Sequence, residues 1–353
     1  MDFSRRSFMQ VAGVGLLWSA KPSMAGQAPR ELVPPVQVPV GRARVSLIQG
    51  DNRRKNVYDA LLAIDDDVKA KLKQRKHIII KPNDTSTVNQ LASTHVDTLR
   101  GILDYLAPRY KGEVVIAEAA SGKTWEGYDN FKYTALPSEY RSLKISLVDL
   151  NEEGRYQVIS LLDKDLHAMP IRLASRLLDP DAFVICAAIN KTHDSAVATM
   201  SVKNMAMGAP LRSAPKETPS WSDKAKFHAG VRQINYNLLT SAQRSAPGWG
   251  VAVIDTFEGM EGDGPVSGDP VPHRIASAST DFVAADRVGV ETMGIDASWV
   301  GYLQYCHKFG LGQYDLSKID VVGTSIAAVR KTYRMHQSIE RQLKWRGPLA
   351  EET

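Results

Sequence analysis

The sequence has few cysteines and no apolar run of membrane-spanning length. Its two cysteines, Cys186 and Cys306, cannot supply the four thiolates of an iron–sulfur cluster, so we do not expect one. Because Cys186 lies inside an apolar run, two separate buried thiols are a simpler interpretation than a disulfide. Every apolar stretch falls short of the about 20 residues that a membrane-spanning helix needs. The mature chain is therefore expected to lack a transmembrane segment.

The sequence also lacks a concentrated basic stripe. Lysine and arginine number 44 against 39 aspartates and glutamates, a formal net charge of +5. This excess is too small and too dispersed for nucleic-acid binding, but it fits a small anionic ligand. With 353 residues, 43% apolar and 24% charged, the chain has an ordinary globular composition. Its length is enough for one large α/β domain or two smaller ones.

The first residues are typical of a twin-arginine export signal. Arg5 and Arg6 precede an apolar stretch at residues 11–20, and small residues at Ser23 and Ala25 suit cleavage before Gly26. This pathway carries folded proteins into the periplasm or out of the cell. We therefore expect a signal peptide at residues 1–25, contact with the export machinery, and a periplasmic or extracellular location. A proline-rich extended leader is expected at residues 26–43.

Residues 44–323 alternate between strand-like and helix-like patterns. This alternation predicts an α/β fold with a largely parallel central sheet, flanking helices and right-handed crossovers. Strands are expected at residues 44–48, 77–81, 113–117, 144–150, 156–161, 184–190, 249–255, 273–279 and 319–323. Helices are expected at residues 56–74, 96–106, 126–143, 170–178, 196–207, 227–243 and 282–293. Residues 210–226 are expected to be a mobile loop, and the basic tail at 324–353 to be helical.

Polar clusters follow several of the predicted strands. They are Lys81 with Asn83, Glu118, Lys191 with His193, and Asp255 with Glu258. The carboxyl ends of parallel strands share one edge of a sheet, so these groups can converge on one crevice. We expect a functional site there.

The residue types in these clusters suggest roles. Lysine binds carboxylates and phosphates, and a desolvated lysine can act as a base or nucleophile. His193 titrates near neutrality and is the acid–base candidate, with Lys191 as its catalytic partner. The expected ligand-binding residues are Lys81, Asn83, Glu118, Lys203 and Asn204.

Residues 255–265 leave two interpretations open. The segment contains four carboxylates, which favours a divalent metal held by Asp255, Glu258 and His273. Its glycines would alternatively let the backbone approach an anionic ligand closely. Residues 121–124 resemble the end of a phosphate-binding P-loop. The first glycine of that motif is missing, which excludes nucleotide hydrolysis on this basis.

Taken together, these motifs resemble the domain of unknown function called DUF362. They occur in order over residues 44–323. The segments are Lys81-Pro82-Asn83, Asn190-Lys191-Thr192-His193, Ser201 to Gly208, Gly259 to Pro265, and Asp281 with Ala284-Ala285-Asp286. Many members of that family carry a ferredoxin-like cysteine run, which this sequence lacks. The resemblance implies a site at these residues and no particular reaction.

Two classes of function remain open from the sequence. The first is an exported enzyme acting on a small carboxylate-bearing anion, with or without a metal. The second is a non-catalytic periplasmic protein that binds a ligand or metal, or that assists a redox enzyme. The basic tail would cover the domain or bind a partner.

Overall fold

A sheet of nine strands organises residues 40–347, the part of the chain that the computed structural model describes. The predicted signal peptide and most of the leader lie outside these residues. The strands of the sheet are β1 Ala43–Gln49, β2 His77–Lys81, β3 Glu113–Glu118, β4 Lys144–Asp149, β7 Ala182–Thr192, β8 Ala198–Thr199, β9 Trp249–Glu261, β10 Asp269–Ser279 and β11 Ile319–Gly323. A separate hairpin pairs β5 Tyr156–Leu162 with β6 Ala168–Ala174.

The strand order is β11-β1-β10-β9-β7-β2-β3-β4, with β8 paired to β7. Strands β9, β7, β2, β3 and β4 run parallel to one another, whereas β10 runs antiparallel to both β9 and β1. The largely parallel α/β sheet that we predicted is confirmed. Because β9, β7, β2 and β3 are consecutive and parallel, their carboxyl ends share one edge.

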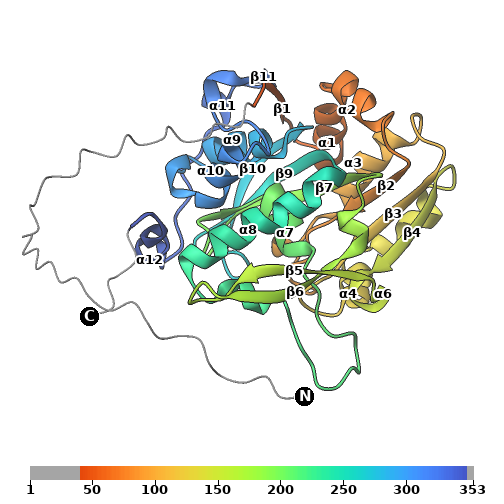
Figure 1. The fold of residues 1–353 in the computed structure, drawn as a ribbon. Coiled ribbons are helices and arrows are strands. Elements are labelled where there is room, and N and C mark those ends of the chain that lie inside the picture. The colour runs from red at the N-terminus through yellow and green to blue at the C-terminus, as the bar shows by residue number, and fades with distance from the viewer. Residues whose placement is uncertain (1–39, 348–353) are drawn as a thin grey trace, which may run out of the picture. The chain divides into compact units, whose positions relative to one another are not determined.

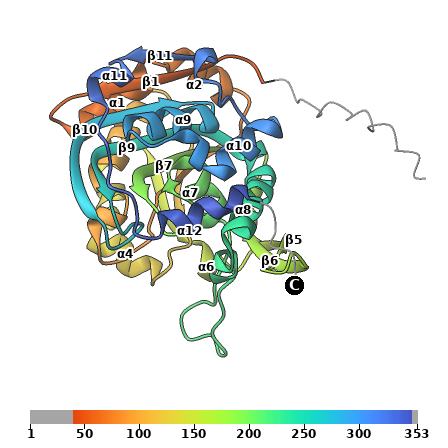
Figure 2. The same cartoon turned by 90° about the vertical axis from the view of Figure 1, so that its left-hand side faces the viewer.

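Helices cover both faces of the sheet (Figures 1 and 2). On one face lie α1 Arg53–Leu62, α2 Asp65–Leu72 and α3 Val96–Leu106. On the other lie α7 Ser201–Gly208, α8 Val231–Ser245, α9 Phe282–Thr292 and α10 Gly301–Lys308. Side chains of a strand alternate between the faces, so Ile78 and Ile80 pack with α1 and α3, while Ile79 packs beneath α7 and α8. Within residues 40–347, no helix has the length and apolarity to cross a membrane.

Two predicted helices are interrupted. The helix expected at 56–74 divides into α1 and α2 at the buried Ile64, and three aspartates in the first turn of α2 favour a new amino end there. The helix expected at 126–143 divides into α4 Thr124–Asn130, a short turn, and α5 Leu136–Glu139. Lys132 adopts a left-handed φ of 64°, which an α-helix does not accommodate.

Two more helical predictions were partly wrong. Residues 170–178 contain the end of β6 and a 3₁₀ turn at Ser175–Leu178. The first part is a strand because its buried side chains, Ile171 and Leu173, are two residues apart, which is the spacing of a strand. In residues 196–207, the chain first pairs with β7 as β8, and α7 begins at Ser201. Helix α10 was not predicted.

The strand predicted at 249–255 and the predicted tail helix also differ in the structure. Strand β9 continues to Glu261 and pairs with β10, so Glu258 lies on a strand. The tail contains α11 Ile326–Val329 and α12 Ile339–Leu343, separated by an extended segment. The amides of Lys331 and Tyr333 in that segment donate to Thr292 and Met293, which rules out a continuous helix.

Candidate functional site

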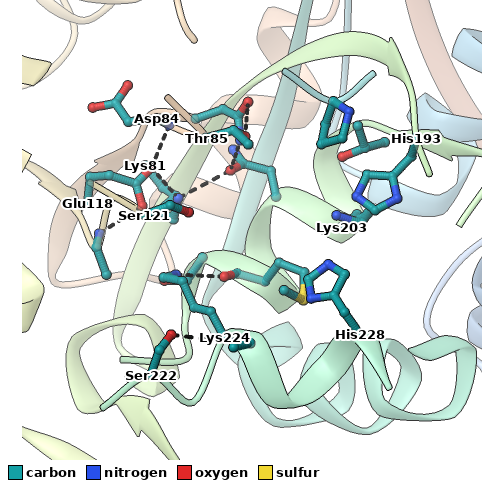
Figure 3. A pocket seen from close by; sticks show the side chains of 18 residues that line it. Lys81, Asp84, Thr85, Glu118, Ser121, His193, Lys203, Ser222, Lys224 and His228 are labelled. Carbon is teal, nitrogen blue, oxygen red and sulfur yellow. Dashed lines mark hydrogen bonds and ion pairs between the residues drawn. The ribbon is translucent and has the colours of Figure 1, made fainter. Parts of the chain in front are cut away.

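A cavity of about 300 Å³ lies at the carboxyl edge of the sheet (Figure 3). Its walls come from the ends of β2 and β3, from α7, and from the segment that precedes α8. The predicted site residues that line it are Lys81, Asn83, Glu118, His193, Lys203 and Asn204. Asp84, Lys224 and His228 also line the cavity and were not predicted from the sequence.

Lys81 and Glu118 form a buried ion pair in the cavity wall. Nζ of Lys81 lies 2.6 Å from Oε2 of Glu118, and the side chains are 1% and 3% exposed. Lys81 also donates to the carbonyl of Pro82 and to Oδ1 of Asn204. Oε1 of Glu118 accepts from the amide of Ala119. With its charges paired and its hydrogen bonds made, this pair is a neutral part of the wall.

Lys191 lies behind the wall. Its Nζ donates to Oδ1 of Asn83 at 2.8 Å, to Oγ1 of Thr85 at 3.2 Å and to the carbonyl of Ala92 at 2.7 Å. Burial, followed by the charge of Lys203, lowers the pKa of Lys191 to about 7. Lys191 therefore reaches the cavity through the two side chains that it binds, Asn83 and Thr85.

Helix α7 carries Lys203 and Asn204 into the cavity. Its amino end is fixed by the buried carboxylate of Asp286, whose Oδ1 accepts from the amide of Ser201 at 2.8 Å and whose Oδ2 accepts from the amide of Val202 at 2.9 Å. This arrangement satisfies two amides that a helix start leaves unpaired. Asp286 thereby sets the position of α7 against the strand ends.

The amine of Lys203 has no partner in the described residues. Its side chain is almost fully buried, yet Nζ makes no hydrogen bond or ion pair within residues 40–347. Burial lowers the pKa of Lys203 to about 8, and the charge of Asp194 opposes this shift. Figure 3 shows the amine next to the ring of His193.

Lys224 and His228 come from the segment that we expected to be a mobile loop and from the turn after it. Nζ of Lys224 donates to the carbonyls of Met207 at 2.7 Å and Gly208 at 3.3 Å, and burial lowers its pKa to about 7. The buried Asp223 anchors the segment by accepting from the amide and the guanidinium of Arg172. This anchor joins residues 51 positions apart, and no local sequence pattern predicts it.

His193 is a neutral base in this environment. Its ring is buried, and Nδ1 lies 3.0 Å from both Oδ1 of Asp194 and the amide of Ser195. Burial, followed by the charge of Lys203, lowers the pKa of His193 to about 3. The ring stacks with that of His228, with centroids 6.0 Å apart, and burial lowers the pKa of His228 as well. Two uncharged imidazoles thus adjoin the amine of Lys203.

Asp84 adds a second carboxyl group beside Glu118. Its Oδ1 accepts from the hydroxyl of Tyr133 at 3.3 Å, and its Oδ2 is buried without a partner in the described residues. Burial, followed by the charge of Glu118, raises the pKa of Asp84 well above its usual value. This shift favours the protonated, uncharged acid.

In the described part of the chain, the ligand atoms of Asp255, Glu258 and His273 do not lie close enough together to share an ion. Asp255 accepts from Thr98 and pairs with Arg53, which also approaches the half-exposed Glu258. The ring nitrogens of His273 lie 2.9 Å from the hydroxyl of Tyr333 and 2.6 Å from the carbonyl of Val329. These donors are already engaged with protein groups. Within residues 40–347, the ligand-type side chains close enough to share an ion are Asp163, Asp165 and His167, at the tip of the β5–β6 hairpin.

The glycine-rich segment after β9 contributes backbone to the site. Oγ1 of Thr192 donates to the carbonyl of Gly262 at 2.8 Å, and Gly262 has a left-handed φ of 71°. This turn brings Pro265 into the cavity wall. The segment therefore reaches the cavity through its backbone turn, while Asp255 and Glu258 face Arg53.

Cys186 and Cys306 are both buried free thiols. Sγ of Cys186 accepts from Nδ2 of Asn204 at 3.2 Å, and burial raises the pKa of Cys186 to about 12. Burial also raises the pKa of Cys306, so both thiols are held in the protonated form.

Comparisons with known proteins identify a family and no activity. No curated protein matches this chain. A solved protein from Thermotoga maritima is 9% identical, with a TM-score of 0.39, over 59% of this chain and 51% of that one. This chain thus spans about half the length of that protein. The family model described as "Domain of unknown function (DUF362)" matches residues 78–291, which contain all the cavity-lining residues. The protein belongs to the DUF362 family.

Proposed function

We propose that this protein is an exported enzyme that binds and acts on a small, carboxylate-bearing anion in the strand-edge cavity. One observation carries the proposal. Lys191, Lys203 and Lys224 are buried at or behind one cavity, and none forms an ion pair with a carboxylate of residues 40–347. Buried cations without a counter-charge are unfavourable, and a bound anion would supply that charge.

The nearby carboxyl groups do not balance these lysines. Glu118 is neutralised by Lys81, and the raised pKa of Asp84 favours its uncharged form. The lowered pKa values of the three lysines have desolvation as their main cause, because it outweighs the opposing charges of the carboxylates Asp84, Glu118 and Asp194. An anion between Lys203 and Lys224 would raise both pKa values again.

Size and proton chemistry support a small substrate and a catalytic role. The volume of about 300 Å³ is at the lower end of the range of ligand pockets. His193 and His228 are neutral at physiological pH, His228 can accept a proton, and Lys203 exchanges its own proton near pH 8. Bases placed beside a bound ligand are what proton transfer requires.

A thermal-shift panel tests the binding proposal. We expect at least one small carboxylate to raise the melting temperature of the wild-type protein. The carboxylates to be tested are oxalate, malonate, pyruvate, succinate and citrate. Lys203→Met and Lys224→Met remove a charge each and should abolish that rise. Lys111→Met, at the amino end of β3 and far from the cavity, is the matched control and should keep it. Equal shifts in all four proteins would show that the anion binds elsewhere.

The export proposal has its own test. Arg5 and Arg6 followed by an apolar stretch support a twin-arginine signal. Expressed in a bacterium with this pathway, the protein should accumulate outside the cytoplasm with Gly26 at its amino terminus. Arg5→Lys together with Arg6→Lys should retain the uncleaved chain inside. Cleavage that is unaffected by the double change would contradict the proposal.

A further inference from the structure

Lys203 differs from the other three buried lysines of the site. Lys81 donates to Glu118, Asn204 and a carbonyl, and Lys191 donates to Asn83, Thr85 and a carbonyl. Lys224 donates to two carbonyls. Nζ of Lys203 has no such contact within the described chain, although its residue is only 6% exposed. Among these four amines it is the one that lines the cavity without a hydrogen bond to any of the residues 40–347.

An amine in this state is suited to nucleophilic attack. A lysine whose N–H groups donate to carbonyls or a carboxylate is held in place by those bonds, so its nitrogen is not free to approach a carbonyl carbon. Burial lowers the pKa of Lys203 to about 8, so roughly a tenth of the molecules carry the free amine at pH 7. Desolvation beside other cations is a recognised way of activating a lysine towards carbonyl compounds.

The neighbouring groups fit the requirements of imine formation. The step needs a group that relays protons, and the rings of His193 and His228 stack beside Lys203 (Figure 3). It also needs a group that holds the substrate in place. Lys224 lines the same cavity and has no carboxylate partner in the described residues, so it can bind a carboxylate.

We propose that Nζ of Lys203 forms an imine with the carbonyl carbon of a small 2-oxo acid, whose carboxylate is bound by Lys224. This inference rests on the proposed function, since it names the class of anion that occupies the cavity. It also assigns to Lys203 a covalent role in place of ion pairing alone.

The step balances without an oxidant or a reductant. The electron pair of the neutral amine forms the C–N bond, and the carbonyl oxygen takes up a proton to give a carbinolamine. The nitrogen gives up its two protons in turn to His228, which passes each of them to the oxygen, and the hydroxyl group leaves as water when the C=N bond forms. Amine and ketone thus give imine and water, and the histidines end in their starting states.

Reductive trapping of the full-length protein tests the proposal. The protein is incubated with glyoxylate, pyruvate or 2-oxoglutarate and cyanoborohydride, and modified lysines are located by peptide mass spectrometry. We expect at least one acid to modify Lys203 far more than exposed lysines such as Lys111. Lactate, which has the carboxylate but no carbonyl group, should protect Lys203 by competition and leave no adduct.

Variants connect the adduct to the site. Lys203→Met should abolish the site-specific adduct, and Lys224→Met should raise the concentration of 2-oxo acid needed for half-maximal labelling of Lys203. Lys111→Met should change neither. The wild-type map alone remains decisive if a variant fails to fold, because it reports each lysine separately.

The outcomes separate this inference from the proposed function. If pyruvate and lactate both raise the melting temperature but Lys203 is not labelled by any of the three acids, the imine is overturned and anion binding stands. If no acid in either assay shifts or labels the protein, both proposals are overturned. Labelling spread evenly over exposed lysines also overturns the imine.

Discussion

At the scale of single residues, the partner of each buried lysine determines what that lysine can do. Lys81 is paired with Glu118 and stiffens the wall, whereas Lys203 faces the cavity without a partner in residues 40–347. Lys81 is the last residue of strand β2, whereas Lys203 lies on helix α7. Their different roles depend on contacts between segments far apart in the chain.

Gly208 provides a way to disturb Lys81 without changing any charge. A methyl group added at Gly208 would collide with Cε and Nζ of Lys81, which Glu118 and Asn204 hold in place. We therefore expect Gly208→Ala to lower the free energy of unfolding by about 1–3 kcal/mol. It should also weaken the anion-induced rise in melting temperature. Urea unfolding and thermal shift measure the two effects.

Gly41→Ala is the matched control, because a methyl group there would have no atom within 4 Å. It should leave both quantities unchanged. If Gly208→Ala behaves like Gly41→Ala, Lys81 is less constrained than its contacts indicate, and the wall is not rigid there.

The sequence could locate part of the site and not all of it. Lys81, Glu118 and His193 were predictable because each follows a strand whose direction the β-α pattern predicts. Lys224 was not, because its segment is anchored by Arg172 and Asp223 across a long stretch of chain. The metal prediction for Asp255, Glu258 and His273 did not anticipate Arg53 from α1 or Tyr333 from the tail, which engage those side chains.

At the scale of elements, the position of α7 controls the site. Two cavity residues, Lys203 and Asn204, lie in its first turns, and Asp286 on α9 holds its amino end. The apolar pattern predicted a helix from residue 196, whereas Ala198 and Thr199 pair with β7. Pairing between strands depends on distant partners, which apolar periodicity does not report.

Asp286→Asn tests this control. The amide group can accept through one oxygen only, so at least one of the amides of Ser201 and Val202 loses its acceptor. We expect the free energy of unfolding to fall by about 1–3 kcal/mol, the cost of a buried unpaired group. Anion affinity should fall as well, because α7 can shift. Urea unfolding and calorimetric titration measure the two quantities.

Asn52→Ala is the comparison. It removes the side chain that accepts from the amide of Lys55 at the start of α1, on the opposite face of the sheet. It should lower stability by about 0.5–2 kcal/mol and leave the affinity of the folded protein unchanged. Loss of affinity in the Asn52 variant, or its retention in the Asp286 variant, would contradict the role given to α7.

At the scale of the whole molecule, the fold concentrates positive charge that the sequence shows only as a small net excess. The parallel direction of the strands could be predicted because helices and strands alternate in the sequence. That the carboxyl ends of these strands share one edge of the sheet follows from their direction. The strand order could not, since β10 and β9 separate β1 from the strands that follow it in the chain. Insertion of later strands between earlier ones depends on the final packing.

The charge of this cavity makes anion binding depend on pH. Lys191 and Lys224 have pKa values of about 7 and Lys203 of about 8, so each is protonated below its pKa and uncharged above it. Anion affinity should therefore be highest near pH 6 and fall, on the order of tenfold or more, by pH 9.5. Because binding favours the protonated lysines, it should take up protons near pH 7.5. Calorimetry in two buffers of different ionisation enthalpy measures both effects, and an affinity that rises with pH would contradict the assignment.

The central claim is that unpaired buried lysines bind an anion in the strand-edge cavity. Calorimetric titration at pH 6.5 tests it most directly, using the acid that gives the largest thermal shift. We predict one binding site per chain in the wild-type protein and in Lys111→Met, and none detectable in the Lys203→Met, Lys224→Met double variant. A folded double variant that binds the acid with wild-type affinity would contradict the claim.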